Sequence, residues 1–187
     1  MGLFGAIKTI IKFRKELKKS IVEAKENEAR YLAMSVEELS ALSDDELFDA
    51  VDSRVENRID GYKKLEEGFA ALNEPQKIFC SLKWMQAEVD NGGLCQFFVN
   101  SSRLVAPLVS EYMGIVGANE HKGLYDAFVE KNGIDLSDFS FFDIVKIEEF
   151  EEKAQKYPFD EYDDAFYGME PLENYLKKYI RDNLENL

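Results

Sequence analysis

The chain has 187 residues and a mass of 21.5 kDa, which suits one domain or one domain with an appendage. Its 45% hydrophobic and 13% aromatic content excludes a disordered chain. The 37 acidic residues outnumber the 23 basic ones, and the net charge of −14 argues against direct nucleic-acid binding. No apolar run reaches the roughly 18 residues of a membrane span. The N-terminal segment does not resemble a signal peptide, so we expect a cytoplasmic protein.

The charge is unevenly distributed along the chain. Residues 1–25 carry seven basic and two acidic side chains, whereas residues 26–74 carry five basic and fourteen acidic ones. Residues 75–125 are balanced, and residues 126–173 carry fifteen acidic against four basic side chains. A basic segment therefore precedes two acidic blocks. Such an uneven distribution of charge gives information about what a protein binds, but not about its fold.

The first segment has the pattern of one long amphipathic helix. Within residues 3–31, apolar residues recur at spacings of three, four and seven, and Arg14 interrupts the series. These apolar positions are Leu3, Ile7, Ile10, Leu17, Ile21 and Ala24. We expect residues 1–31 to form a basic amphipathic N-terminal helix and residues 35–187 to form an acidic helical domain.

A stripe of lysines, Lys8, Lys12, Lys15 and Lys19, runs beside the apolar positions of this helix. A basic amphipathic helix can lie on an anionic membrane surface. It can also pack on the protein's own core, or on a second copy in a homodimer. Packing is the more common outcome for such helices, so a membrane surface is not the expected partner.

Helix signals continue after this segment. Ser43 and Glu46 match a capping box, which predicts a helix that begins near Asp44. Gly61 and Gly68 weaken the pattern that follows, so either one helix or two can reach residue 72.

The remainder of the chain also indicates an all-α protein. Pro75 fits the first turn of a helix, and Asn91-Gly92-Gly93 predicts a turn before a short apolar helix at residues 94–100. Residues 134–147 are compatible with a loop or a short strand. Further helices are expected at 105–117, 119–132, 148–156 and about 170–184. The predicted fold is a single compact multi-helix domain with a long N-terminal helix, because no alternation of strands and helices is visible.

No pattern predicts catalysis or metal binding. Cys95 lies in an apolar segment, which is typical of a buried cysteine rather than a nucleophile. His121 stands near a helix start, where we expect a solvated side chain. The acidic run from Asp160 lacks the ligand spacing and the glycine of an EF-hand calcium loop. We therefore expect no catalytic residue, no metal and no cofactor.

Acidic residues instead form two clusters that are candidates for binding a partner. The first follows one helical face at spacings of three and four, which places neighbouring carboxylates about 5–6 Å apart. Phosphates along a DNA strand have a comparable spacing, although a solvated acidic face also serves solubility. The candidate residues are Asp45, Asp49, Asp52, Glu56 and Asp60 in the first cluster, and Glu148, Glu149, Glu152, Asp160, Asp163 and Asp164 in the second.

The segment from Glu88 to Ser102 reads EVDNGGLCQFFVNSS. It resembles the signature of a bacterial family of DNA-mimic proteins, long catalogued as a domain of unknown function. Arg103 departs from the pattern, because a glycine often stands there. The residues that carry the resemblance are Glu88, Asn91, Gly92, Gly93, Gln96, Phe97, Phe98 and Asn100. With a similar C-terminal end, the likeness covers about residues 60–185.

The resemblance implies an all-helical domain that often dimerises. For the described family member, it implies an acidic surface that occupies the DNA-binding face of a transcriptional regulator. From the residues themselves, the two glycines allow a positive-φ turn, and the two phenylalanines fill the core. The amides of Asn91, Gln96 and Asn100 suit backbone groups at the turn and at helix ends. A small-molecule pocket lined by these three amides is an alternative.

We therefore expect a non-enzymatic DNA mimic whose partner is a basic DNA-binding protein, such as a transcription factor. An immunity-type protein that neutralises a basic toxin would use the same electrostatics. An enzyme built on the three amides is a further alternative. Contiguous exposed carboxylates would favour the two binding proteins, and a concave pocket at the amides would favour the enzyme.

Overall fold

The computed structural model describes residues 3–146 and 148–187, with side chains from residue 12 onward. Every regular element in these residues is a helix, so the all-α prediction is confirmed. None of these helices is long and apolar enough to cross a membrane. The chain divides into two compact units, Met1–Arg54 and Val55–Leu187. Residues 1 and 2 of the predicted N-terminal helix, and residue 147 of the ambiguous segment, lie outside the described residues.

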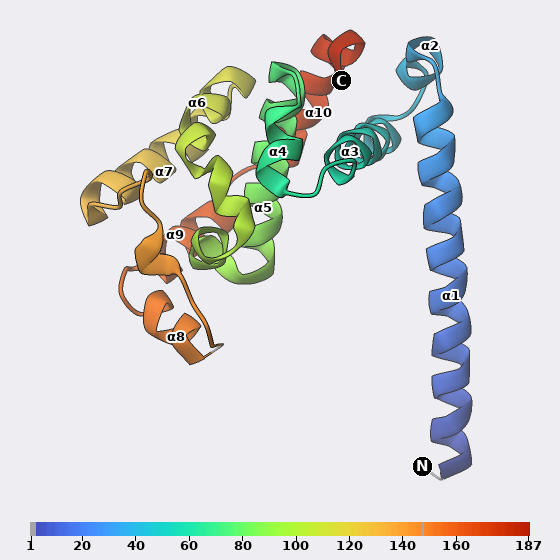
Figure 1. Ribbon diagram of the computed structural model, residues 1–187, viewed down its shortest axis with the longest axis horizontal. Helices are drawn as coiled ribbons and strands as arrows, with labels where there is room; N and C mark the ends of the chain where they lie inside the picture. The colour runs from blue at the N-terminus through green and yellow to red at the C-terminus, as the bar shows by residue number, and fades with distance from the viewer. Residues whose placement is uncertain (1–2, 147) are drawn as a thin grey trace. The chain divides into compact units, whose positions relative to one another are not determined.

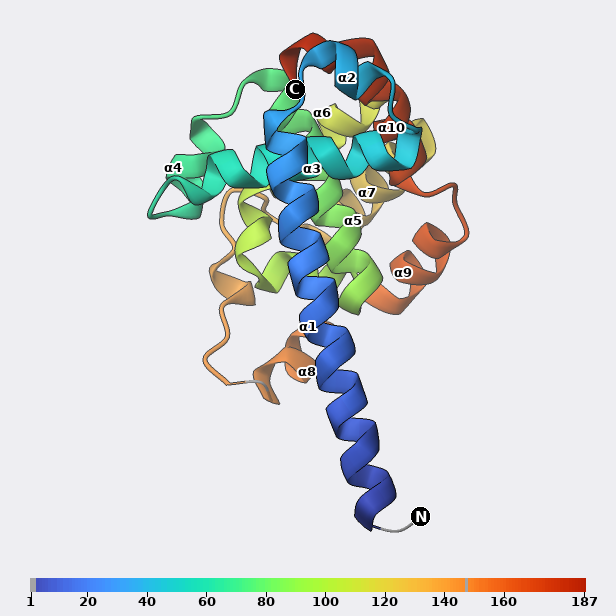
Figure 2. The same cartoon turned by 90° about the vertical axis from the view of Figure 1, so that its right-hand side faces the viewer.

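The first unit begins with the predicted long helix. This helix, α1 (Leu3–Ala33), is uninterrupted, as Figure 2 shows. A short helix, α2 (Val36–Ser40), follows it. The next helix, α3 (Asp44–Asp60), begins at the predicted residue, and the boundary between the two units falls within it.

Two capping boxes determine where α2 and α3 begin. The Ser35 hydroxyl accepts a hydrogen bond from the Glu38 N–H at 3.2 Å, and the Glu38 carboxylate accepts one from the Ser35 N–H at 2.8 Å. Ser43 and Glu46 form the same reciprocal pair, at 3.3 and 3.4 Å. These bonds satisfy amide groups that a helix start leaves without an intrahelical partner.

The second unit is organised around one long helix, α5. The α6, α8, α9 and α10 helices and the 3-10 helix η1 all contact it, and α7 packs on α6 and α9. Figure 1 shows α5 in green, with α6 and α7 on one side and α10 on the other. The elements are α4 (Leu65–Ala70), α5 (Glu74–Val99), η1 (Ser101–Val105), α6 (Ala106–Val116), α7 (Asn119–Asn132), η2 (Ser140–Phe142), α8 (Glu148–Ala154), α9 (Phe159–Tyr167), α10 (Leu172–Asn183) and η3 (Leu184–Asn186).

The ambiguous segment 134–147 is a loop with one 3-10 turn in its described part. Two of its aromatic residues, Phe139 and Phe142, pack on Phe98 in the core, with ring centroids 5.6 and 5.2 Å from that of Phe98. Phe159 completes the cluster at 6.2 Å from Phe98. Phe98 is fully buried, as predicted for the two phenylalanines of the family motif.

The helix α9, which runs from Phe159 to Tyr167, was not predicted from the sequence. Its buried positions are Phe159, Tyr162 and Phe166, at spacings of three and four. This is the spacing of an amphipathic helix, but nine residues give the pattern few repeats. Pro158 directly precedes the helix, in a position where its missing N–H costs nothing.

His121 is buried, so the prediction of a solvated histidine is wrong. The side chain is 1% exposed and meets the rings of Phe166 and Tyr175 edge-on, with centroids 5.2 and 5.9 Å away. Neither ring nitrogen has a hydrogen-bond partner among the described residues. Burial lowers the pKa of the imidazole, and the nearby carboxylates of Glu120 and Glu170 raise it by less.

We expect His121 to make the protein less stable in mild acid. Because the imidazole has a lower pKa in the folded chain, the unfolded chain binds the additional proton and stability falls as the pH drops below about 6.5. A His121→Phe substitution keeps an aromatic ring in the site and should remove this slope, which for one proton is at most about 1.4 kcal/mol per pH unit. Urea unfolding of both chains at about pH 7.5 and about pH 5.5 measures the difference. Equal pH dependence in the two chains would contradict the assignment.

Candidate functional site

The central helix α5 bends at Gly92 and Gly93, where the sequence predicts a turn. Gly93 has a φ of +81°, in the left-handed region that favours glycine. Gly92 has a φ of −165°, which is extended backbone open to any residue. The predicted positive φ is therefore confirmed for Gly93 and wrong for Gly92. The bend divides α5 into a segment that ends near Asn91 and one that begins at Leu94.

The carboxylate of Asp163, from α9, closes this bend. Its Oδ1 accepts a hydrogen bond from the Leu94 N–H at 2.8 Å and thereby caps the second segment of α5. A Cβ atom on Gly93 would lie 2.1 Å from Asp163 Oδ2, so no side chain fits there. Burial raises the pKa of Asp163, the Leu94 hydrogen bond lowers it, and Asp160 and Asp164 raise it further. Asp163 was predicted to be part of an acidic surface that binds a partner. It is instead half-buried, and its carboxylate stabilises the bend in α5.

The carboxylate of Glu88 connects three parts of the second unit. Its Oε2 accepts hydrogen bonds from Gln96 Nε2 at 2.8 Å and from Asn100 Nδ2 at 2.7 Å. Its Oε1 accepts one from the Ser102 hydroxyl at 2.8 Å. One side chain before the bend therefore holds the segment after the bend and the start of η1. Hydrogen bonds to an ionised acceptor are the stronger kind, so this network stabilises the bend.

The network corrects the roles predicted for the amides of the family motif. Gln96 and Asn100 bind the Glu88 carboxylate rather than backbone groups, and Asn91 is exposed. The position of Gln96 also favours glycine at residue 92, because a Cβ atom on Gly92 would lie 2.1 Å from Gln96 Oε1. The signature residues therefore act together to bend one helix.

Cys95 lies just after the bend and is buried, as predicted. Burial, with a contribution from the charge of Asp163, raises the pKa of its thiol to about 12. Such a thiol is protonated at neutral pH, whereas the nucleophile in cysteine chemistry is the thiolate. No group of three or more His, Cys, Asp or Glu side chains in residues 3–146 and 148–187 is placed to hold a metal ion.

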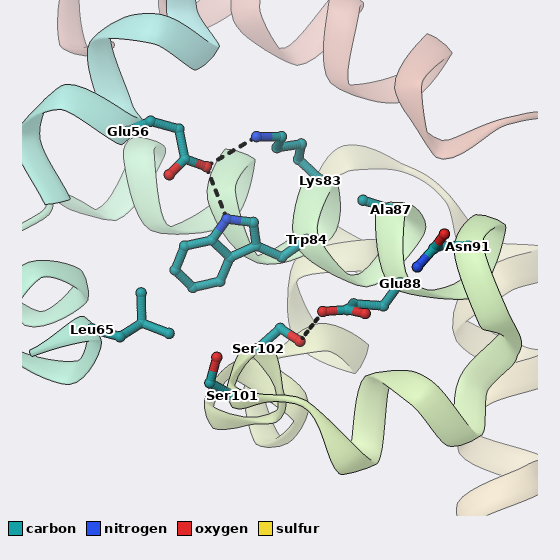
Figure 3. Close-up of a pocket in the computed structure, with 9 residues that line it drawn as sticks. All are labelled: Glu56, Leu65, Lys83, Trp84, Ala87, Glu88, Asn91, Ser101 and Ser102. Atoms are coloured by element: carbon teal, nitrogen blue, oxygen red, sulfur yellow. Dashed lines mark hydrogen bonds and ion pairs between the residues drawn. The ribbon is translucent and has the colours of Figure 1, made fainter. Parts of the chain in front are cut away.

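An open pocket of about 460 Å³ lies beside the Glu88 network (Figure 3). Of the three amides predicted to line a small-molecule site, Asn91 is in its wall, but Gln96 and Asn100 are not. This pocket is therefore not the site built on all three amides that the enzyme alternative requires. The lining residues are Glu56, Leu65, Lys83, Trp84, Ala87, Glu88, Asn91, Ser101 and Ser102.

Glu56, in one wall of this pocket, is held by two donors from α5. Its Oε1 accepts hydrogen bonds from Lys83 Nζ and from Trp84 Nε1, both at 3.0 Å (Figure 3). Glu56 was predicted to be a partner-binding carboxylate, but it is half-buried and neutralised within the chain. Lys83 lies 27 positions from Glu56 in the chain, so no local sequence pattern indicates that the two side chains pair.

The structure separates the remaining predicted carboxylates into exposed and half-buried ones. Asp52 and Glu149 are half-buried. The first cluster is divided between the two units, whereas the second lies wholly within the second unit. The exposed members are Asp45, Asp49 and Asp60 on α3, Glu148 and Glu152 on α8, and Asp160 and Asp164 on α9.

The second unit is thus an acidic helical domain, and its central helix is bent by two glycines and held by two carboxylates. The DMP19-like protein family matches residues 70–183, a range that contains the whole Glu88–Asn100 motif and α9. The chain belongs to the DMP19-like protein family, a DNA-mimic family, as the resemblance implied. No curated protein and no solved structure matches the chain.

The two glycines of the bend should differ in their tolerance of a side chain. Gly93→Ala places a Cβ against Asp163 in a left-handed conformation, and we expect it to cost about 3 kcal/mol. Gly92→Ala needs only a shift of the Gln96 amide, with a cost of about 1 kcal/mol for the disturbed hydrogen bond. Urea unfolding measures both free energies. Equal losses would show that the bend is not held in the way described.

Glu88 should contribute more stability than a neighbouring exposed carboxylate on the same helix. Glu88→Gln removes the charge and one acceptor oxygen while three donors still point at the site, so we expect a loss of about 3 kcal/mol. Asp90→Asn is the matched control, because Asp90 is exposed and accepts one bond from Gln86 at 3.3 Å. Its expected effect is below about 0.5 kcal/mol. Similar unfolding of both variants would argue against a central role for Glu88.

Proposed function

We propose that this protein is a non-enzymatic DNA mimic in the cytoplasm. Its exposed carboxylates occupy the basic DNA-binding surface of a transcriptional regulator or another DNA-binding protein, and it does not bind nucleic acid itself. The observation that carries the proposal is the family match over the second unit of a chain with a net charge of −14. The exposed carboxylates of that unit support it further.

The contact surface that we propose consists of carboxylates on α8 and α9, called here the α8–α9 acidic surface. Like charges one helical turn apart, such as Asp160 and Asp164, destabilise a helix by a few tenths of a kcal/mol, so the fold does not require them. Lys153 is the basic residue of α8, and its ammonium group lies over the Phe141 ring, 4.4 Å from the ring centroid. The members of the surface are Glu148, Glu151, Glu152, Asp160, Glu161 and Asp164, all exposed.

The spacing of these carboxylates suits a surface that normally holds phosphates. Helical neighbours three or four positions apart lie about 5–6 Å from each other, close to the separation of phosphates along a DNA strand. Each Lys or Arg of the partner that would hold a phosphate can then hold a carboxylate. Asp45 and Asp49 on α3 form a second exposed pair with the same spacing, in the first unit.

An interaction of this kind should be driven mainly by charge. The Debye length falls from about 10 Å at 0.1 M salt to about 3 Å at 1 M, so contacts between exposed charges lose most of their attraction over this range. DNA should compete with the protein, because both occupy the same basic surface. Glu56 and Asp163 are excluded from the proposed contact, since reversing either charge would disturb the fold.

Reversing two charges of the α8–α9 acidic surface should abolish partner binding without unfolding the chain. The immobilised chain captures the partner from a native lysate at about 0.1 M salt, and either about 1 M salt or excess duplex DNA releases it. The double variant Asp160→Lys, Asp164→Lys should capture at least about tenfold less. The matched control is Glu111→Lys, Glu130→Lys, which makes the same change in net charge at exposed positions on α6 and α7.

Two outcomes would count against the proposal. If the control variant loses capture as much as the α8–α9 variant, net charge rather than this surface determines binding. If the complex is indifferent to both salt and DNA, the DNA-mimic function is wrong. A captured basic toxin that does not bind DNA would point to the immunity-type alternative.

A further inference from the structure

The apolar residues of α1 follow the repeat of a coiled coil. Their spacing alternates between four and three from residue 3 to residue 24, which is the a and d pattern of consecutive heptads. The apolar members are Leu3, Ile7, Ile10, Leu17, Ile21 and Ala24, called here the α1 seam. Arg14 occupies one a position within it. A single polar residue at an a position is a known means of setting register and oligomeric state.

The α1 seam is open where its side chains are described. Leu17 and Ile21 are each 48% exposed, and Phe13 beside them is 63% exposed. Tyr31, seven residues after Ala24, is 6% exposed, and its carbonyl accepts a hydrogen bond from Arg54 Nε at 3.0 Å. The C-terminal end of α1 is therefore held within its own unit, whereas Leu17 and Ile21 before it are exposed. A helix gains most of its stability from packing such a face.

The opposite side of α1 carries ion pairs with the same period. Lys12 pairs with Glu16 at 3.7 Å, and seven residues later Lys19 pairs with Glu23 at 3.2 Å. All four side chains are more than half exposed. Such pairs between neighbouring turns are typical of the solvent side of a coiled-coil helix. Residues 1–25 also hold seven basic against two acidic side chains, and a helix on an anionic membrane has such a basic polar face, so the membrane is the alternative that the experiments must test.

We propose that α1 pairs with α1 of a second copy of this chain through the α1 seam. The strict heptad spacing, the open apolar side chains and the heptad-spaced ion pairs on the other side all favour this occupant. The matched family segment begins at residue 70, so this pairing would be an addition to the family domain. It would join two acidic domains and so raise their affinity for a partner with two DNA-binding surfaces. The pairing itself does not depend on the proposed DNA mimicry.

Two neighbouring residues provide a matched test in the full chain. Ile21 belongs to the α1 seam, whereas Val22 points away from it and is 54% exposed. We expect Ile21→Glu to raise the dissociation constant of self-association at least about tenfold, and Val22→Glu to leave it unchanged. Arg14→Ile should lower the dissociation constant, because it replaces the polar a position with an apolar one. Sedimentation equilibrium over a range of concentrations measures all three.

Hydrogen exchange locates the association within the chain. In the parent chain, the amides of residues 10–24 should become more protected as the concentration rises, and in Ile21→Glu they should not. Flotation with vesicles of phosphatidylglycerol and phosphatidylcholine tests the membrane alternative. The proposal is overturned if the parent chain is a monomer, if Val22→Glu weakens association as much as Ile21→Glu, or if protection of α1 requires vesicles.

Discussion

The hydrogen bonds that Glu88 accepts from Gln96, Asn100 and Ser102 are the contacts on which the second unit depends. A continuous α5 would direct its last two turns away from the core. The bend instead places Phe98 among the aromatic rings of the loop and of α9. Glycine permits this bend but does not favour it over other conformations, because glycine is also the most flexible residue when unfolded. The polar network selects the bent form.

The sequence predicted the features that depend on short-range patterns. The capping box at Ser43, the turn at Gly92-Gly93 and the single long N-terminal helix all involve residues close together in the chain, and all three are present. A positive φ was predicted for both glycines, but only Gly93 has one. That detail depends on which neighbour covers each glycine, and Asp163, which covers Gly93, comes from a helix far along the chain.

The site could be predicted only in part, because a carboxylate does not reveal from its sequence context whether it faces solvent or a donor. Glu56 has its donor in Lys83 on another helix, and Asp163 has its donor in the Leu94 N–H. Asp163 did carry a usable signal: it lies four residues after Phe159 and three before Phe166, both buried. His121 was misread for the same reason, since its aromatic neighbours come from α9 and α10.

The two faces of α9 impose different limits on how this protein can change over time. Under the proposed function, Asp160 and Asp164 on the outer face need only a negative charge, which glutamate or a neighbouring position can also supply. Asp163, on the inner face, accepts a hydrogen bond from the Leu94 N–H. Its carboxylate lies so close to Gly93 that a Cβ atom on Gly93 would not fit. The longer glutamate would not fit that space. Substitutions on the outer face would therefore change the proposed contact with a partner, while Asp163 preserves the fold.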